Sequence, residues 1–242
     1  PAVRMLRSYG LERFHNRLDK LQLHHIDKDP NYYGLSLILG GAESSLWEIT
    51  NAYATLASTL NFYTETSSEY RTSETTTPTY IVSSTKPKEK QQTPSIFGAG
   101  AIYKTFEALQ KVNRPLGQEN WDFFSNSQPI AWKTGTSFCF KDAWAVGVTK
   151  KYAVSVWAGN ADGEGRPGLT GLQAAAPILF DALEVLPKSD WFAPPFDDLA
   201  EVTICSKSGT LAGVFCDETV SEFMRRKSRP GGRLFHFYLT LD

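Results

Sequence analysis

The sequence contains little sulfur, almost no net charge and no long apolar run. Its 242 residues include three Cys and two Met, and 25 Lys and Arg nearly balance 26 Asp and Glu. The net charge of −1 gives no electrostatic basis for binding nucleic acid or an anionic membrane surface. No apolar stretch approaches the roughly 20 residues that a membrane-spanning helix needs. The sequence therefore predicts a globular protein without a nucleic-acid partner.

The pattern of apolar residues predicts a mixed α/β fold. Apolar residues make up 41% of the chain and charged residues 21%, which are typical globular values. Apolar residues at helical spacing predict helices over 1–23 with a break at Gly10, from Ser45 onward, over 99–112 and over 174–186. Ser45 and Glu48 predict a capping box at the start of the second of these helices, and its expected apolar stripe is Leu46, Ile49, Tyr53 and Leu56. Shorter runs around residues 129–159 have the character of strands.

Changes in composition predict the domain boundaries. Residues 1–187 form the main domain, residues 188–199 form a linker, and residues 200–242 form a small β-rich C-terminal module. Within the main domain, residues 64–95 are dominated by Thr, Ser, Glu, Lys and Pro, so we expect an exposed insertion there. Because the sequence opens at Pro1 without an initiator Met, we expect it to be a piece of a longer protein.

The cysteines and the paired histidines do not predict a metal site. Cys139 is expected to be a small buried residue. Cys205 and Cys216 flank a short β-like stretch and are either a disulfide of an oxidising compartment or two reduced thiols. His24 and His25 are adjacent, so their side chains would diverge on a helix, and we expect an exposed loop pair.

The stretch Lys133-Thr134-Gly135-Thr136-Ser137 carries the chemistry that is most specific in the chain. It follows an apolar segment and precedes two strand-like runs, so a hairpin should stand behind it. A cation and hydroxyl groups at this spacing suit a substrate carboxylate, because charge-assisted hydrogen bonds are strong. Gly135 lets a bound peptide approach the strand, and the amide N–H of Thr136 would supply half of an oxyanion hole.

Two similar tetrapeptides elsewhere in the chain are weaker candidates. Lys207-Ser208-Gly209-Thr210 also fits K-[ST]-G-T, but it lies beyond the linker, and we expect a simple turn at Gly209. Ser83 and Lys86 fit S-x-x-K, the pattern of a serine nucleophile with its lysine one helical turn later. Pro87 disfavours helical geometry at Lys86, so Ser83 is not the expected nucleophile.

The chain resembles the C-terminal half of the transpeptidase domain of bifunctional class A penicillin-binding proteins. The matching stretches follow the family's order and are residues 1–6, 33–41, 46–54, 133–144, 156–160, 167–171 and 174–181. The resemblance implies the penicillin-binding/β-lactamase-like fold, an antiparallel sheet flanked by helices, here incomplete on its N-terminal side. It also implies that the chain begins just after the S-x-N motif, with the S-x-x-K serine further upstream.

The resemblance implies a function for the intact protein, and it implies that this chain alone is catalytically incomplete. The family cross-links D-Ala-D-Ala stem peptides of peptidoglycan through an acyl-serine intermediate, binds β-lactams and needs no cofactor. It works at the periplasmic face of the inner membrane and carries a glycosyltransferase domain and a membrane anchor. By resemblance, Lys133, Thr134, Gly135 and Thr136 form the catalytic strand motif, and Lys133, Thr134, Thr136 and Ser137 contact the substrate.

Two other hypotheses about the function remain open at this point. In a D,D-carboxypeptidase, water would replace the acceptor amine, and the K-T-G-T-S stretch does not separate these two reactions. The chain would instead serve as an interaction protein if its C-terminal module docked a periplasmic partner. The strand motif and its hairpin favour an enzyme.

Overall fold

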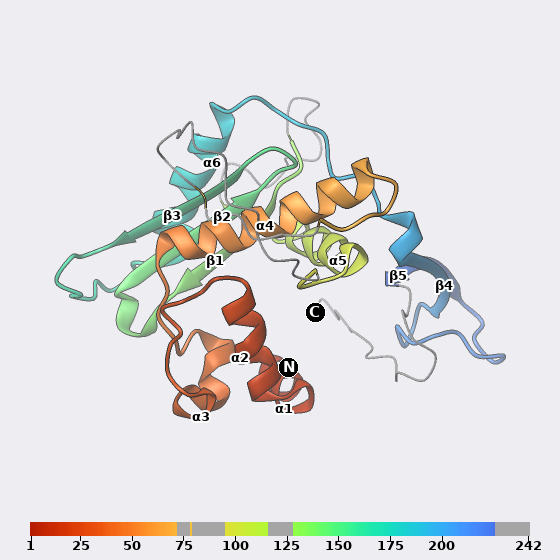
Figure 1. Cartoon of the computed structure of the whole chain (residues 1–242), viewed down its shortest axis with the longest axis horizontal. Coiled ribbons are helices and arrows are strands. Elements are labelled where there is room, and N and C mark those ends of the chain that lie inside the picture. The colour runs from red at the N-terminus through yellow and green to blue at the C-terminus, as the bar shows by residue number, and fades with distance from the viewer. Residues whose placement is uncertain (72–77, 79–94, 116–127, 226–242) are drawn as a thin grey trace.

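The computed structural model describes residues 1–71, 78, 95–115 and 128–225 (Figure 1). Most of the expected polar insertion, including Ser83 and Lys86, lies outside these residues, as does the end of the C-terminal module. Among the described helices, none combines the length and apolar character that crossing a bilayer requires.

A three-stranded antiparallel sheet forms the centre of the main domain. Its strands are β1 (Ala131–Thr136), β2 (Asp142–Val148) and β3 (Ala153–Gly159), in the order β1-β2-β3. The expected hairpin of β2 and β3 is therefore confirmed, and β1 pairs with β2 on its other side. In the described part of the chain, the second edge of β1 has no strand beside it.

Helices cover both faces of this sheet (Figure 1). On one face, α4 (Leu46–Glu65) and α5 (Ala99–Gln110) build a core with the first residue of β1 and the last of β2. On the other face, α6 (Ala176–Glu184) packs on Trp132. A π-helical turn, η4 (Gly171–Ala175), precedes α6. The mixed α/β class with an antiparallel sheet between helices is confirmed.

A cluster of short helices precedes α4. It consists of α1 (Ala2–Tyr9), α2 (Leu11–Lys20), α3 (Pro30–Tyr33) and the 3-10 helix η1 (Gly34–Leu39). Gly10 separates α1 from α2 with a φ of 102°, a value that a residue with a side chain rarely adopts. The predicted helical segment with a break at Gly10 is confirmed.

Helix α4 begins as its sequence predicts but buries more than one stripe. The capping box is present: the Ser45 hydroxyl accepts from the Glu48 amide, and the Glu48 carboxylate accepts from the Ser45 amide. The expected stripe of Leu46, Ile49, Tyr53 and Leu56 is at most partly buried. The most buried positions include polar Thr55 and Thr59, because α4 contacts two core clusters at once.

The C-terminal module is attached through buried contacts. The expected linker runs without helix or strand to the 3-10 turn η5 (Phe196–Asp198), and then β4 (Leu199–Cys205) pairs with β5 (Thr219–Arg225). Phe192 within this linker is only 2% exposed and packs on Phe106 of α5, with ring centroids 5.1 Å apart. The linker is thus part of the core of the main domain.

Candidate active site

Strand β1 is buried at its start and exposed at its end. Ala131 and Trp132 are fully buried, whereas Lys133, Gly135 and Thr136 are exposed and Thr134 is half-buried. The Trp132 indole donates to the Val112 carbonyl at 3.2 Å and packs edge-on against a ring of α6. This anchor holds the strand so that its K-T-G-T end projects from the core.

The side chains of the motif alternate between the two faces of the sheet. Lys133 and Gly135 share the face that carries Ala131. Helices α4 and α5 cover this face at Ala131, whereas residues 133 and 135 are exposed beyond them. Thr134 and Thr136 share the other face, which carries Trp132 and the helix α6. A ligand along the free edge of β1 therefore meets the lysine on one side and the threonines on the other.

The turn η4 holds the end of β1. The amide of Gly171 donates to the Thr136 hydroxyl oxygen at 3.0 Å. A Cβ on Gly171 would lie 2.4 Å from the Trp144 carbonyl oxygen and 2.5 Å from that of Gly135, so only glycine allows this approach. The hydroxyl accepts this bond with a lone pair, which leaves its proton for a ligand.

Gly135 has a different neighbourhood. A Cβ at this position would lie 3.5 Å from Cβ of Trp144, an ordinary contact. The packing of the chain therefore does not demand glycine at position 135. The missing side chain instead keeps the exposed face of the strand open, as the sequence analysis expected for a peptide-binding edge.

Lys133 is the cation of the site. Its ammonium donates to the Thr134 carbonyl oxygen at 2.7 Å and is exposed. In the described residues, no carboxylate lies within ion-pair distance of Lys133. The charge is consequently available to an anionic ligand.

Ser137 organises the turn that follows the strand. Its hydroxyl oxygen accepts from the Asp142 amide at 2.8 Å, and its own amide donates to the Asp142 carbonyl at 3.0 Å. These bonds close the 3-10 turn η3 (Phe138–Phe140). A substrate contact by Ser137 remains a prediction, whereas its role in the turn is a feature that the sequence analysis missed.

The prediction that Cys139 is buried is wrong. The residue is exposed and has a φ of 59°, and Phe140 beside it has a φ of 56°. Two successive left-handed residues turn the chain back toward β2 at the rim of the sheet, so the thiol faces outward. Phe138 at the tip of this turn is 90% exposed.

The K-T-G-T end of the sheet is an open surface. A hollow of about 740 Å³ lies at the opposite end, where Lys150 of the β2–β3 turn meets Asn61 and Trp191. No residue of the motif lines it. The site thus presents a strand edge and a rim of side chains rather than a closed pocket.

The comparisons with known proteins agree with this geometry. The chain is 29% identical over 186 residues to penicillin-binding protein 1C of Escherichia coli K12, a match that covers 77% of this chain and 21% of the relative. The resemblance to the penicillin-binding proteins is confirmed. No family model matches the chain.

A solved structure shares the fold of the chain. The crystal structure of penicillin-binding protein 1A from Haemophilus influenzae superposes with a TM-score of 0.62 at 18% identity. The superposition covers 97% of this chain and 39% of that protein. The transpeptidase fold is therefore confirmed, and the chain spans well under half the length of either penicillin-binding protein.

The second K-[ST]-G-T tetrapeptide is a turn, as expected. Gly209 has a φ of 65° and its amide donates to the Cys205 carbonyl at 2.8 Å. The hydroxyls of Ser208 and Thr210 bond to each other at 2.8 Å. The tetrapeptide closes a loop of the C-terminal module and has no sheet edge of the kind that β1 offers.

Cys205 and Cys216 are both free thiols that lie close together in this module. Hydrogen bonds from Ser208, and a further one with the Cys216 thiol, lower the pKa of Cys205 to about 7. The Gly213 amide donates to the Cys216 sulfur at 3.3 Å. The structure holds this pair as two thiols, and its oxidation to a disulfide stays a prediction.

His24 and His25 form an exposed loop pair, as predicted. The structure also places Glu48 beside them: its carboxylate lies 2.7 Å from Nδ1 of His25 and accepts from the His24 amide at 2.9 Å. Among the described residues, no three His, Cys, Asp or Glu side chains gather as a metal site would require.

Proposed function

We propose that this chain supplies the substrate-binding strand of a peptidoglycan D,D-transpeptidase that is acylated by penicillin. The observation that carries the proposal is the exposed K-T-G-T end of β1, where, among the described residues, Lys133 has no ion-pair partner and the strand edge has no neighbouring strand. The relationship to two penicillin-binding proteins supports the same reaction class.

The exposed residues suit the terminus of a D-Ala-D-Ala stem peptide. Lys133 pairs with the terminal carboxylate, and the Thr134 and Thr136 hydroxyls donate further hydrogen bonds to it. An extended peptide adds along the free edge of β1 through main-chain hydrogen bonds, a recurrent mode of peptide recognition. The open face at Gly135 leaves room for it. β-Lactams occupy the same place as donor mimics.

The covalent step also requires a serine nucleophile with its lysine (S-x-x-K) and an S-x-N motif, and we place both outside this chain. In the proposed reaction, a serine hydroxyl attacks the carbonyl of the penultimate D-Ala and the terminal D-Ala leaves. The amide N–H of Thr136 contributes to the oxyanion hole, and an amine of a neighbouring stem then takes the acyl group from the serine. The S-x-x-K and S-x-N motifs belong to another part of the longer protein.

The whole protein would work at the periplasmic face of the inner membrane, where peptidoglycan is assembled. Anchor and glycosyltransferase functions belong to the longer protein in this proposal. The C-terminal module, which carries β4 and β5, is a candidate for docking a periplasmic partner protein.

The decisive experiment measures acylation by a fluorescent penicillin in the longer protein that carries this chain. Lys133→Gln should lower the second-order acylation rate roughly 10- to 100-fold, the size of a lost charge-assisted hydrogen bond. Lys207→Gln removes the same charge from the second K-[ST]-G-T tetrapeptide and is the matched control, with an unchanged rate. Equal rates for Lys133→Gln and wild type would overturn the proposal.

Product analysis with stem peptides then separates the two enzymatic reactions. A transpeptidase joins two stems when an amine-bearing stem is present, whereas a D,D-carboxypeptidase releases D-Ala and leaves the stem free. Release of D-Ala without any joined product would favour the carboxypeptidase.

A further inference from the structure

The first two helices concentrate positive charge at one end of the chain. Residues 1–20, which contain α1 and α2, include five Lys and Arg and two Asp and Glu. The rest of the chain has 20 Lys and Arg and 24 Asp and Glu. Figure 1 shows α1 and α2 in the cluster of short helices that stands out from α4 and the sheet. The near-zero net charge is therefore the sum of a basic end and a slightly acidic remainder.

A hollow of about 530 Å³ lies on this basic surface. The residues around it follow one another at helical spacing from the end of α1 along one face of α2, and they are Tyr9, Glu12, Arg13, Asn16, Arg17 and Lys20. Elsewhere on α2, Leu18 packs on a core cluster. The hollow thus lies along the polar side of the helix.

Arg17 is held in place by a distant segment. Its guanidinium donates to the Ile96 carbonyl oxygen and lies over the Phe97 ring, 5.5 Å from the ring centroid. The guanidinium has five N–H donors, and this bond uses one of them. The half-buried side chain therefore keeps its charge at a fixed place beside the hollow.

Arg13 is the cation that helix stability does not explain. It lies in the first turn of α2, where the helix dipole disfavours a positive charge, whereas Arg17 and Lys20 suit the last turn. A Cβ on Gly10 would lie 3.8 Å from Cγ and Cδ of Arg13, so its stem covers the junction of α1 and α2. A cation in this unfavourable turn indicates a role in binding.

The cations of the hollow have no acidic partner in the described part of the chain. There, no carboxylate lies within ion-pair distance of Arg13, Arg17 or Lys20, and Glu12 beside them forms no such pair. The hollow keeps three cations against one acid. A concave surface with an excess of positive charge attracts anionic ligands.

The spacing of the cations favours a ligand with several anionic groups. Arg13 and Lys20 are seven positions apart, which is about 10 Å along a helix. A single phosphate or carboxylate does not cover this distance. Carboxylates on alternate residues of an extended peptide stand about 7 Å apart, so two or three of them reach all the cations.

An anionic membrane surface fits the hollow less well. Basic clusters that bind anionic lipids contain four to eight Lys and Arg, and three surround this hollow. A flat bilayer surface also does not enter a concave site, whereas the side chains of a peptide do.

We propose that this hollow is a docking site for an acidic segment of a partner protein, with Arg13, Arg17 and Lys20 as the contacts for its carboxylates. Tyr9 and Asn16 supply a hydroxyl and an amide donor beside them. The guanidinium groups suit carboxylates because they bind both oxygens at once. No residue of the K-T-G-T strand lines the hollow, so the inference does not depend on the proposed function.

The test measures the binding of two dye-labelled hexapeptides to the 242-residue chain by fluorescence anisotropy. One peptide alternates Glu with Ser, and the other alternates Gln with Ser. We expect the Glu peptide to bind about tenfold more tightly, as several partly exposed charge pairs allow. The difference should shrink in 0.5 M salt.

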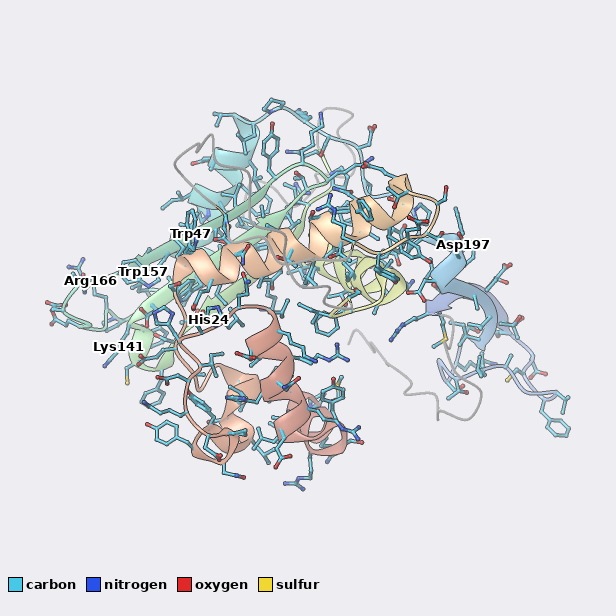
Figure 2. All side chains as sticks on the ribbon, in the orientation of Figure 1. His24, Trp47, Lys141, Trp157, Arg166 and Asp197 are labelled. Carbon is cyan, nitrogen blue, oxygen red and sulfur yellow. The ribbon has the colours of Figure 1, made fainter. Side chains whose placement is uncertain are left out.

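Charge-removing variants locate the binding. Arg13→Gln combined with Lys20→Gln should weaken the Glu peptide about three- to tenfold and leave the Gln peptide unchanged. Arg17 is kept because it also has structural contacts. The control Lys151→Gln with Arg166→Gln removes two exposed charges and should bind as wild type does. Figure 2 shows Arg166 at the tip of the sheet, away from α1 and α2.

Charge reversal distinguishes a lost contact from a lost fold. Arg13→Glu combined with Lys20→Glu should reject the Glu peptide and bind a peptide that alternates Lys with Ser. A chain that had merely unfolded would not reverse its preference in this way.

Three results would overturn the docking site. The first is equal binding of the Glu and Gln peptides by wild type, or a preference that survives in the Arg13→Gln/Lys20→Gln variant. The second is capture by phosphatidylglycerol vesicles without binding of the Glu peptide, which would assign the hollow to a lipid head group. The third is full displacement of the Glu peptide by equimolar inorganic phosphate at constant ionic strength, which would assign it to a single anion.

Discussion

The carboxylate of Glu48 lies 2.7 Å from the imidazole Nδ1 of His25 at the point where α4 begins. Burial alone would raise the pKa of Glu48, but hydrogen bonds from His25, from the Ser44 hydroxyl and from the Ser45 amide together lower it to about 2. One acidic side chain thus joins the His24–His25 loop to the first turn of α4, and the position is almost fully buried.

This arrangement predicts a loss of stability in acid. A carboxylate whose pKa is lower in the folded state adds its full stabilisation to the free energy of unfolding above its ordinary pKa of 4.5. This stabilisation disappears as the pH falls toward 2. A shift of this size corresponds to roughly 3 kcal/mol. Urea unfolding between pH 6 and pH 2 should show this loss in the wild type, and Glu48→Gln should have a flatter profile.

Glu43→Gln is the matched control for this experiment. Glu43 lies on the same segment but is exposed. Its substitution should leave the pH profile of the wild type unchanged. A Glu48→Gln variant with the full acid loss of the wild type would contradict the assignment of this loss to Glu48.

Two glycines near the site should respond differently to alanine. Gly171→Ala places a methyl group against two carbonyl oxygens, and we expect it to lower the free energy of unfolding by about 1–3 kcal/mol. Gly135→Ala meets only an ordinary contact, so stability should stay within about 1 kcal/mol. In the longer protein, Gly135→Ala should still slow acylation by penicillin, because its methyl group stands on the open face of β1.

Denaturant unfolding of the two variants and penicillin acylation of Gly135→Ala check this pair. Equal losses of stability in both variants would mean that the close approach of η4 to β1 is not a stabilising feature. Unchanged acylation in Gly135→Ala would show that the substrate does not pass over this face.

The attachment of the C-terminal module should depend on Phe192. The residue is 2% exposed and packs between Phe106 and Trp191. Phe192→Ala should lower the free energy of unfolding by about 3–5 kcal/mol, as for other buried aromatic side chains. Phe215→Ala in the module removes a ring that is 94% exposed and serves as the control. Thermal or urea unfolding with the same midpoint for both variants would contradict the anchoring role.

Local patterns predicted most of the elements, and contacts between distant segments account for what they missed. The hairpin of β2 and β3 and the capping box of α4 depend on residues close in sequence, and both were predicted correctly. The bond from Gly171 to Thr136 joins residues 35 positions apart, and the bond from the Gly100 amide to Asp198 joins residues 98 apart. Periodicity carries no information about such pairs.

The site was predictable as a strand motif but not as a surface. The strand that carries residues 133–136 was predicted correctly, and its role in binding a substrate carboxylate stays a prediction. The exposure of Cys139 depends on its left-handed backbone conformation and on the close contact of its carbonyl group with Gly165. These features follow from tertiary packing, so the exposed Cys139 was not apparent from the sequence.

The thiols of Cys205 and Cys216 should form a disulfide under oxidising conditions. The two are neighbours, and the pKa of about 7 leaves much of Cys205 as the reactive thiolate at neutral pH. With oxidised glutathione as the oxidant, the thiolate forms a mixed disulfide and releases one glutathione. Cys216 then displaces the second glutathione to close the intramolecular bond.

Maleimide labelling followed by mass measurement should find only Cys139 modified in the oxidised chain and all three cysteines modified after reduction. Cys216→Ser should leave Cys205 as a stable glutathione adduct. Free labelling of both cysteines after oxidation would show that the module keeps two reduced thiols.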